Sequence, residues 1–67
     1  MAEQEKRPLA FYTAAEKSII ALMQRSQGKT FDELDQGEID TWIKQAFYSG
    51  DIDEMTRADG TVEKRPG

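Results

Sequence analysis

The second half of the chain carries the strongest helical periodicity, and this pattern constrains the fold more than any other feature of the sequence. Large apolar residues recur on one face at spacings of three and one: Ile39, Trp42, Ile43, Ala46 and Phe47. Asp35 precedes this run with Glu38 three residues later, which is typical of a helix N-cap, and Ser49-Gly50 is a C-terminal stop. The sequence therefore predicts an amphipathic helix that begins after Asp35 and ends near Ser49.

A second amphipathic helix is predicted earlier in the chain. Thr13-Ala-Ala-Glu16 is a capping-box pattern and Gly28 is a helix stop, so this helix runs from about Ala14 to Ser26. Its apolar face contains Ala15, Ile19, Leu22 and Met23, which recur at helical spacing. Ile20 lies beside this face. Thr30-Phe-Asp-Glu33 is another capping-box pattern, which predicts a short helical turn before the later helix.

The residues after Gly50 leave two interpretations open. Asp59-Gly60 favours a two-residue hairpin turn, because both residue types can adopt a positive φ. The arms of this hairpin are residues 54–58 and 61–65, and its side chains on one face are Met55, Arg57, Val62 and Lys64. The alternative is a flexible tail with a local turn, because an isolated hairpin is only marginally stable.

These patterns predict a mainly α fold: a small single domain with two main helices, a short helical turn and a C-terminal β-hairpin. Residues 1–10 are expected to form a flexible lead, residues 11–53 the helical core, and residues 54–67 the hairpin or tail. A chain of 67 residues buries only about 60% of its unfolded surface. We expect the small core to contain Leu9, Phe11, Ala15, Ile19, Leu22, Met23, Phe31, Leu34, Ile39, Trp42, Ile43, Ala46, Phe47 and Ile52.

The composition argues against an enzyme. The chain has no Cys and no His, which removes zinc sites, thiol nucleophiles and histidine acid–base chemistry. Gly28-Lys29-Thr30 lacks the preceding glycine and strand of a phosphate loop. Asp51-Ile-Asp53-Glu54 fails as a calcium loop, which would need a ligand at Met55 and glycine at Thr56. We therefore expect no catalytic residues, no cofactor and no metal site.

The hydropathy pattern predicts no membrane segment. No apolar run approaches the roughly 18 residues needed to span a bilayer. The initial residues, MAEQEKRPLA, are charged and lack the apolar stretch of a secretory signal. These features lead us to expect a cytoplasmic protein that does not associate with membranes.

Charge is unevenly distributed. The formal net charge is −4, yet residues 32–54 hold eight acidic residues against Lys44 alone, a net of −7. Such a field repels nucleic acid and attracts basic surfaces. Two interpretations are open: a solvated face that keeps the protein soluble, or a docking surface. The candidate partner-binding residues are Asp32, Glu33, Asp35, Glu38, Asp40, Tyr48, Asp51 and Asp53. Tyr48 lies off the apolar face of the later helix and Tyr12 immediately precedes the N-cap of the earlier one, and either is a candidate exposed anchor.

The order of the elements resembles the winged helix-turn-helix over about residues 13–65. IIALMQRSQGKTFDEL resembles its first helix and the start of its second. IDTWIKQAFYSGDIDEM resembles its recognition helix running into the wing, and TRADGTVEKRP resembles the wing itself. The resemblance implies DNA binding, with amides reading bases and cations holding phosphates. The residues it points to are Gln36, Lys44, Gln45, Arg57, Lys64 and Arg65.

The balance of charge favours a protein partner. The helix that would read DNA carries two acidic residues, Glu38 and Asp40, and one cation, Lys44. DNA-binding proteins normally bring Arg, Lys, Asn or Gln to phosphates and base edges. We therefore expect a non-enzymatic protein-interaction module. It would be a regulator or inhibitor that docks an acidic surface on a basic partner. In one version of this hypothesis, the module docks at the partner's nucleic-acid-binding site. The alternatives are a winged-helix DNA-binding regulator and a small structural subunit of a larger assembly.

Overall fold

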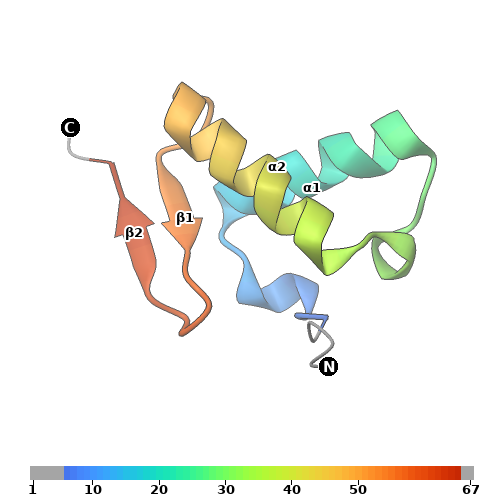
Figure 1. Cartoon of the computed structure of the whole chain (residues 1–67), viewed down its shortest axis with the longest axis horizontal. Helices are drawn as coiled ribbons and strands as arrows, with labels where there is room; N and C mark the ends of the chain where they lie inside the picture. The colour runs from blue at the N-terminus through green and yellow to red at the C-terminus, as the bar shows by residue number, and fades with distance from the viewer. Residues whose placement is uncertain (1–5, 66–67) are drawn as a thin grey trace.

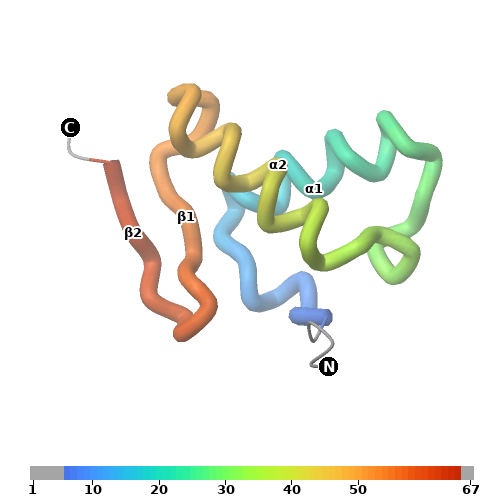
Figure 2. Tube along the Cα trace, viewed as in Figure 1, coloured from blue at the N-terminus to red at the C-terminus, as the bar shows by residue number. Residues whose placement is uncertain are grey.

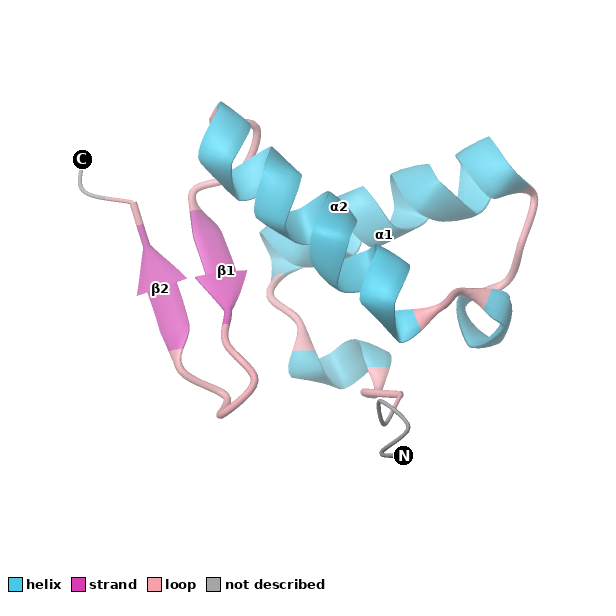
Figure 3. Ribbon diagram, viewed as in Figure 1, coloured by secondary structure: helices cyan, strands magenta, loops and turns pink. Residues whose placement is uncertain are grey.

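The computed structural model describes residues 6–65, which form two helices beside a C-terminal hairpin (Figure 1). The elements, with η for a 3-10 helix, are η1 (Leu9–Phe11), α1 (Ala14–Gln27), η2 (Phe31–Glu33), α2 (Gln36–Ser49), β1 (Glu54–Thr56) and β2 (Val62–Lys64). Figure 3 shows how helix dominates and how the two strands lie together at one side. The predicted fold class, a mainly helical single domain with a short antiparallel hairpin, is confirmed. Neither helix in this part of the chain has the length and apolar character needed to cross a membrane.

Both helices begin at the predicted caps. The Thr13 side chain accepts from the Glu16 N–H at 3.2 Å, and Glu16 Oε1 accepts from the Thr13 N–H at 2.9 Å. At the start of α2, the Asp35 carboxylate accepts from the Glu38 N–H at 3.2 Å. These bonds satisfy backbone donors that the first helical turn leaves unpaired. Both helices end at glycines in the left-handed region, and α1 runs one residue further than predicted.

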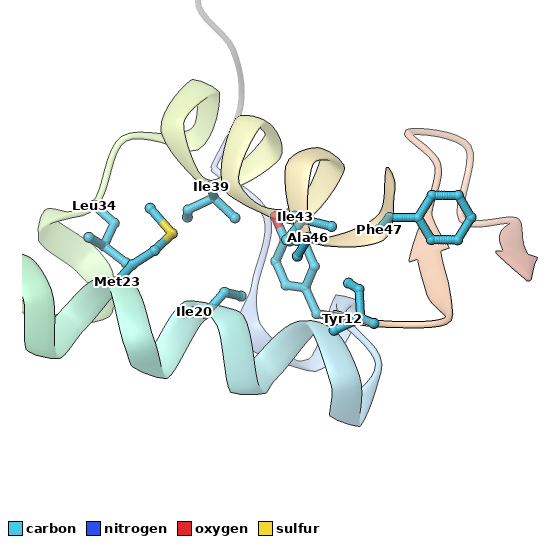
Figure 4. Packing of buried hydrophobic residues seen from close by; sticks show 9 residues of the cluster. Tyr12, Ile20, Met23, Leu34, Ile39, Ile43, Ala46 and Phe47 are labelled. Carbon is cyan, nitrogen blue, oxygen red and sulfur yellow. The ribbon is translucent and has the colours of Figure 1, made fainter. Parts of the chain in front are cut away.

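The core lies between α1 and α2, and Figure 4 shows Ile20 and Met23 of α1 facing Ile39 of α2. Its buried residues are Tyr12, Ile20, Met23, Leu34, Ile39, Ile43, Ala46, Phe47 and Ile52. The half-buried apolar residues packed at its border are Phe11, Ala15, Ile19, Phe31, Trp42 and Met55. Most predicted core residues are therefore in the core or at its border.

The predicted buried face of α1 was wrong by about one residue of rotation. Leu22 is 47% exposed, whereas Ile20 is 1% exposed. The buried face consists of Glu16, Ile20 and Met23, so Met23 is shared with the predicted face and the centre of the face is rotated by about 80° at about 100° per residue. The shift occurs because a charged residue, Glu16, takes an interior position that a hydropathy pattern assigns to the surface. Leu9, another predicted core residue, is 41% exposed.

Glu16 connects α1 to the hairpin. Its side chain is completely buried. Oε1 accepts from the Thr56 hydroxyl at 2.5 Å as well as from Thr13, and Oε2 accepts from the Thr56 N–H at 2.7 Å. The same carboxylate therefore completes the cap of α1 and holds β1 against the helical core.

The first described residues are held against the core. Lys6 Nζ donates to the carbonyl oxygens of Phe31 and Leu34 at 2.6 and 2.7 Å. The Arg7 N–H donates to Gln36 Oε1 at 3.0 Å. Residues 1–5 of the expected flexible lead lie outside the described residues. Within the described part, this lead is fixed to η2 and to the start of α2.

The C-terminal hairpin is present, but its arms are shorter than predicted and its register differs. Met55 pairs with Glu63, and Thr56 pairs with Val62. Adjacent residues of a strand point to opposite faces, so Met55 and Val62 lie on opposite sides. The prediction that they share a face was therefore wrong. Met55 is half-buried beside the core, whereas Val62 is exposed.

The turn explains the register. The Gly60 N–H donates to the Arg57 carbonyl at 2.9 Å, and the Arg57 N–H donates to the Thr61 carbonyl at 2.7 Å. Asp59 does not adopt a positive φ, which the predicted two-residue turn requires. Its carboxylate instead accepts from the Thr61 N–H at 2.9 Å. The loop is therefore longer than two residues, and the pairing shifts by one position.

Candidate functional site

The acidic segment folds into two groups at opposite ends of α2. We call Asp32, Glu33, Asp35 and Glu38 the first acidic group, and Asp51, Asp53 and Glu54 the second acidic group. The first lies on η2 and the start of α2, and the second follows the end of α2. A helix of 14 residues is about 21 Å long, and Figure 2 shows η2 and the hairpin at its two ends. Residues 32–54 therefore do not form one continuous acidic surface.

The first acidic group is largely used by the local fold. Glu33 Oε1 accepts from the Thr30 N–H at 2.8 Å and from the Thr30 hydroxyl at 3.2 Å. Glu38 Oε2 accepts from Gln27 Nε2 at 3.1 Å, which joins the end of α1 to the start of α2. Asp35 caps α2. These carboxylates are exposed, but all except Asp32 have a structural contact.

Two of the exposed carboxylates should titrate below their ordinary values. The Thr30 backbone N–H, followed by the Thr30 hydroxyl, lowers the pKa of Glu33. The Thr61 backbone N–H likewise lowers the pKa of Asp59. The stability these bonds contribute is present above the unfolded-state pKa and is lost as pH falls through the folded pKa. Carboxyl-carbon NMR titration of the folded chain should show both groups below 4.5 and 3.8, their respective ordinary values.

Thr30→Ala is the control for this titration. It removes the hydroxyl but keeps the backbone N–H, which is the larger cause, so the pKa of Glu33 should stay below its ordinary value. A titration of Glu33 at or above 4.5 in the original chain would contradict the hydrogen bond.

The second acidic group is not ion-paired. Asp51 and Asp53 are exposed and Glu54 is half-buried. Within residues 6–65 the ion pairs are Arg7–Asp40 at 3.1 Å and Arg57–Glu63 at 2.6 Å. The second acidic group is therefore available to an external cation. The negative end of the α2 macrodipole adds to the same potential.

Asp40, a predicted partner-binding residue, belongs to an internal network. It accepts from Arg7 at 3.1 Å and from Gln36 Nε2 at 3.0 Å. Gln36 is 4% exposed and also donates to the Tyr12 hydroxyl at 2.7 Å. This network buries Tyr12 to 5% exposure, so the prediction of Tyr12 as an exposed anchor was wrong. Tyr48, the other predicted anchor, is 66% exposed.

The residues implied by the DNA-binding resemblance do not share one face. Gln36 is buried, and its amide is used within the chain. Lys44 and Arg57 line a cleft of about 340 Å³ between α2 and the hairpin. Gln45 lines a different hollow, between α1 and α2. Gln45 therefore lines a different hollow from Lys44 and Arg57, and the Gln36 amide is already used within the chain, so these residues do not form one base-reading surface.

The cations of the hairpin have contacts within the chain. Arg57 forms the ion pair with Glu63, and the hydrogen bond in that pair raises the pKa of Arg57. The Arg65 guanidinium lies over the Phe47 ring, 5.2 Å from its centroid. Lys64 is exposed on β2.

An apolar groove lies between α1 and α2, and sequence analysis missed it. It is about 280 Å³ in volume, and its apolar lining consists of Ile19, Leu22, Trp42 and Ala46. Past Ile19 and Asp51 it continues into a hollow lined by Ala15, Ser18, Ile52 and the second acidic group. We call the two together the α1–α2 groove. The sequence assigned Ile19, Leu22 and Trp42 to the core, whereas Ile19 and Trp42 are half-buried at its border and Leu22 is exposed.

The described residues contain no cluster of three or more His, Cys, Asp or Glu side chains that could hold a metal ion. Comparison of the chain with protein-family models, curated proteins and solved structures found no match. The fold defines a small, mainly helical domain with a C-terminal hairpin. Its function is therefore inferred from the two acidic groups and the α1–α2 groove.

Proposed function

We propose that this chain is a small non-enzymatic protein-interaction module that docks on a basic surface of a partner protein. The observation that supports this most strongly is the second acidic group. It is unpaired within the described residues, and it borders the apolar α1–α2 groove. An acidic patch beside apolar surface offers both steering and buried contact area.

The charge pattern favours protein over nucleic acid. Unpaired carboxylates repel phosphates and attract Lys and Arg side chains of a partner. A partner whose basic surface normally holds nucleic acid would be blocked by such a module, which is the inhibitor form of the proposal. A regulator that docks elsewhere on a basic partner uses the same contacts.

The test is capture of partners by the full chain from a nuclease-treated extract, compared with a variant that keeps the fold. The variant combines Asp32→Asn, Glu33→Gln, Asp51→Asn and Asp53→Asn, and Gln at position 33 retains the capping oxygen. We expect a basic-surfaced protein to be retained at low salt and lost as salt rises, because screening weakens exposed charge contacts. Recovery with the variant should fall about tenfold.

A matched control carries Lys17→Gln and Lys29→Gln, two exposed cations on α1 and after it, and should recover the partner as well as the original chain. Equal recovery by the acidic variant at all salt concentrations would contradict the proposal. Fluorescence anisotropy with a 20-base-pair DNA duplex tests the alternative that the chain binds DNA. Tight binding that weakens steeply with salt would support a DNA-binding protein instead.

A further inference from the structure

We infer that the α1–α2 groove is the binding site for one basic amphipathic helix of the partner protein. This inference rests on the proposed function and deepens it, because it assigns the surface and the chemistry of the segment that occupies it. The second acidic group would contact the cations of that helix, and the apolar part of the groove would hold its apolar side chains.

The apolar part of the groove is exposed where a partner side chain could enter it. Leu22 is 47% exposed, and Ile19 and Trp42 are only half-buried. Ala46 also lines this part of the groove, and its small side chain leaves room on the α2 side. Tryptophan is enriched among the residues that dominate binding energy at interfaces, and an apolar groove of this kind can hold the apolar anchors of a bound helix.

The charged side chains that line the groove all have the same sign. They are Asp51, Asp53 and Glu54, and within residues 6–65 no Lys or Arg lines either of its hollows. This differs from the cleft on the other side of α2, which is lined by both cations and carboxylates. The groove therefore matches an apolar stripe that is flanked by Lys or Arg at one end.

The walls of the groove favour a helix over an added strand. They consist mostly of side chains from α1 and α2, whose backbone groups are paired within the helices. An added strand needs free backbone donors and acceptors along a sheet edge, whereas a helix is recognised through its side chains.

The length of the groove fits about two helical turns. On α1 it extends from Ala15 to Leu22, a rise of about 10.5 Å at 1.5 Å per residue. Apolar anchors at positions i, i+4 and i+7 of a partner helix span the same distance. The part of that helix nearest Ala15 would lie beside the second acidic group, which lines the same hollow, and its cations are needed there.

The chain contains a single tryptophan, so Trp42 fluorescence reports on the groove. The probe is a tryptophan-free synthetic peptide of 18 residues, made of Leu and Lys, with Leu on one helical face. Titration of the full chain at about 0.1 M salt, where exposed charges more than about 10 Å apart are largely screened, should shift Trp42 emission to shorter wavelength, because the peptide covers the exposed part of the indole. A peptide of the same composition in scrambled order, and one with Glu in place of Lys, should bind at least tenfold more weakly.

Variants then locate the contacts. Leu22→Gln removes an exposed apolar wall residue, and we expect it to raise the Kd of the peptide about tenfold. Asp51→Asn combined with Asp53→Asn should raise the Kd by a similar factor. The matched control, Asp32→Asn combined with Glu33→Gln, removes the same charge at the far end of α2 and should change the Kd by less than about twofold. Far-ultraviolet circular dichroism verifies that each variant is folded.

Three outcomes would overturn the inference. The first is absence of peptide binding, or binding that leaves Trp42 emission unchanged. The second is equal weakening by the two acidic double variants, which would leave a general acidic docking surface and remove the groove from it. The third is a shift of Trp42 emission with rising concentration of the chain alone, which would make a second copy of the chain the occupant. The capture experiment with all four acidic substitutions decides the proposed function separately, because it does not depend on Leu22 or Trp42.

Discussion

Glu16→Ala is expected to lower the free energy of unfolding by about 3–5 kcal/mol, because it leaves three hydrogen-bond donors without their acceptor. A folded chain of 67 residues has a total stability of about 3–10 kcal/mol at 0.05–0.15 kcal/mol per residue. The variant should therefore be largely unfolded or close to it. Urea denaturation followed by circular dichroism measures the effect.

The size of this effect follows from the donors that the substitution leaves behind. The Thr13 N–H, the Thr56 N–H and the Thr56 hydroxyl all donate to the Glu16 carboxylate. Each buried donor without a partner costs about 1–3 kcal/mol. The loss of these bonds also uncaps α1 and releases β1 from the core.

Two further variants separate these contributions. Glu33→Ala removes the equivalent capping carboxylate at the exposed η2 turn, and its effect should be clearly smaller. Glu16→Gln keeps the shape but presents an NH₂ group to one of its donors, so the hairpin should lose order before the helices do. Similar destabilisation by Glu16→Ala and Glu33→Ala would contradict the buried role of Glu16.

The ends of the helices could be predicted because caps are local. Thr13, Asp35, Gly28 and Gly50 each act within a few residues of their own position. The rotation of α1 could not be predicted, because it depends on a contact between Glu16 and Thr56, which lie 40 residues apart. A hydropathy pattern places a glutamate on the surface unless its distant partner is known.

The candidate site was predictable only in part. The sequence correctly indicated exposure for most members of the acidic segment, but it could not show that α2 separates them into two groups. Asp40 has a cation from the N-terminal segment, 33 residues away in sequence. The α1–α2 groove follows from the rotation of α1, so no pattern in the sequence alone could have located it.

Ile39→Ala should lower the free energy of unfolding by about 3–4 kcal/mol, within the range for truncating a fully buried aliphatic side chain. Ile39 is 0% exposed, and Figure 4 shows it facing Ile20 and Met23 across the contact between the two helices. The substitution leaves a cavity that a core of this size cannot fill, because the surrounding side chains relax only partially. Thermal unfolding followed by circular dichroism measures the loss.

Leu22→Ala is the control, since it deletes aliphatic carbons from a residue that the hydropathy pattern places in the same core. At 47% exposure, Leu22 loses less transfer free energy on truncation, and we expect a cost below about 1 kcal/mol. If Leu22→Ala lowered the free energy of unfolding more than Ile39→Ala does, α1 would bury the face predicted from the sequence and the groove would be closed. A small effect at Leu22 shows that its side chain contributes little to folding, and it makes Leu22→Gln a clean probe of binding in the α1–α2 groove.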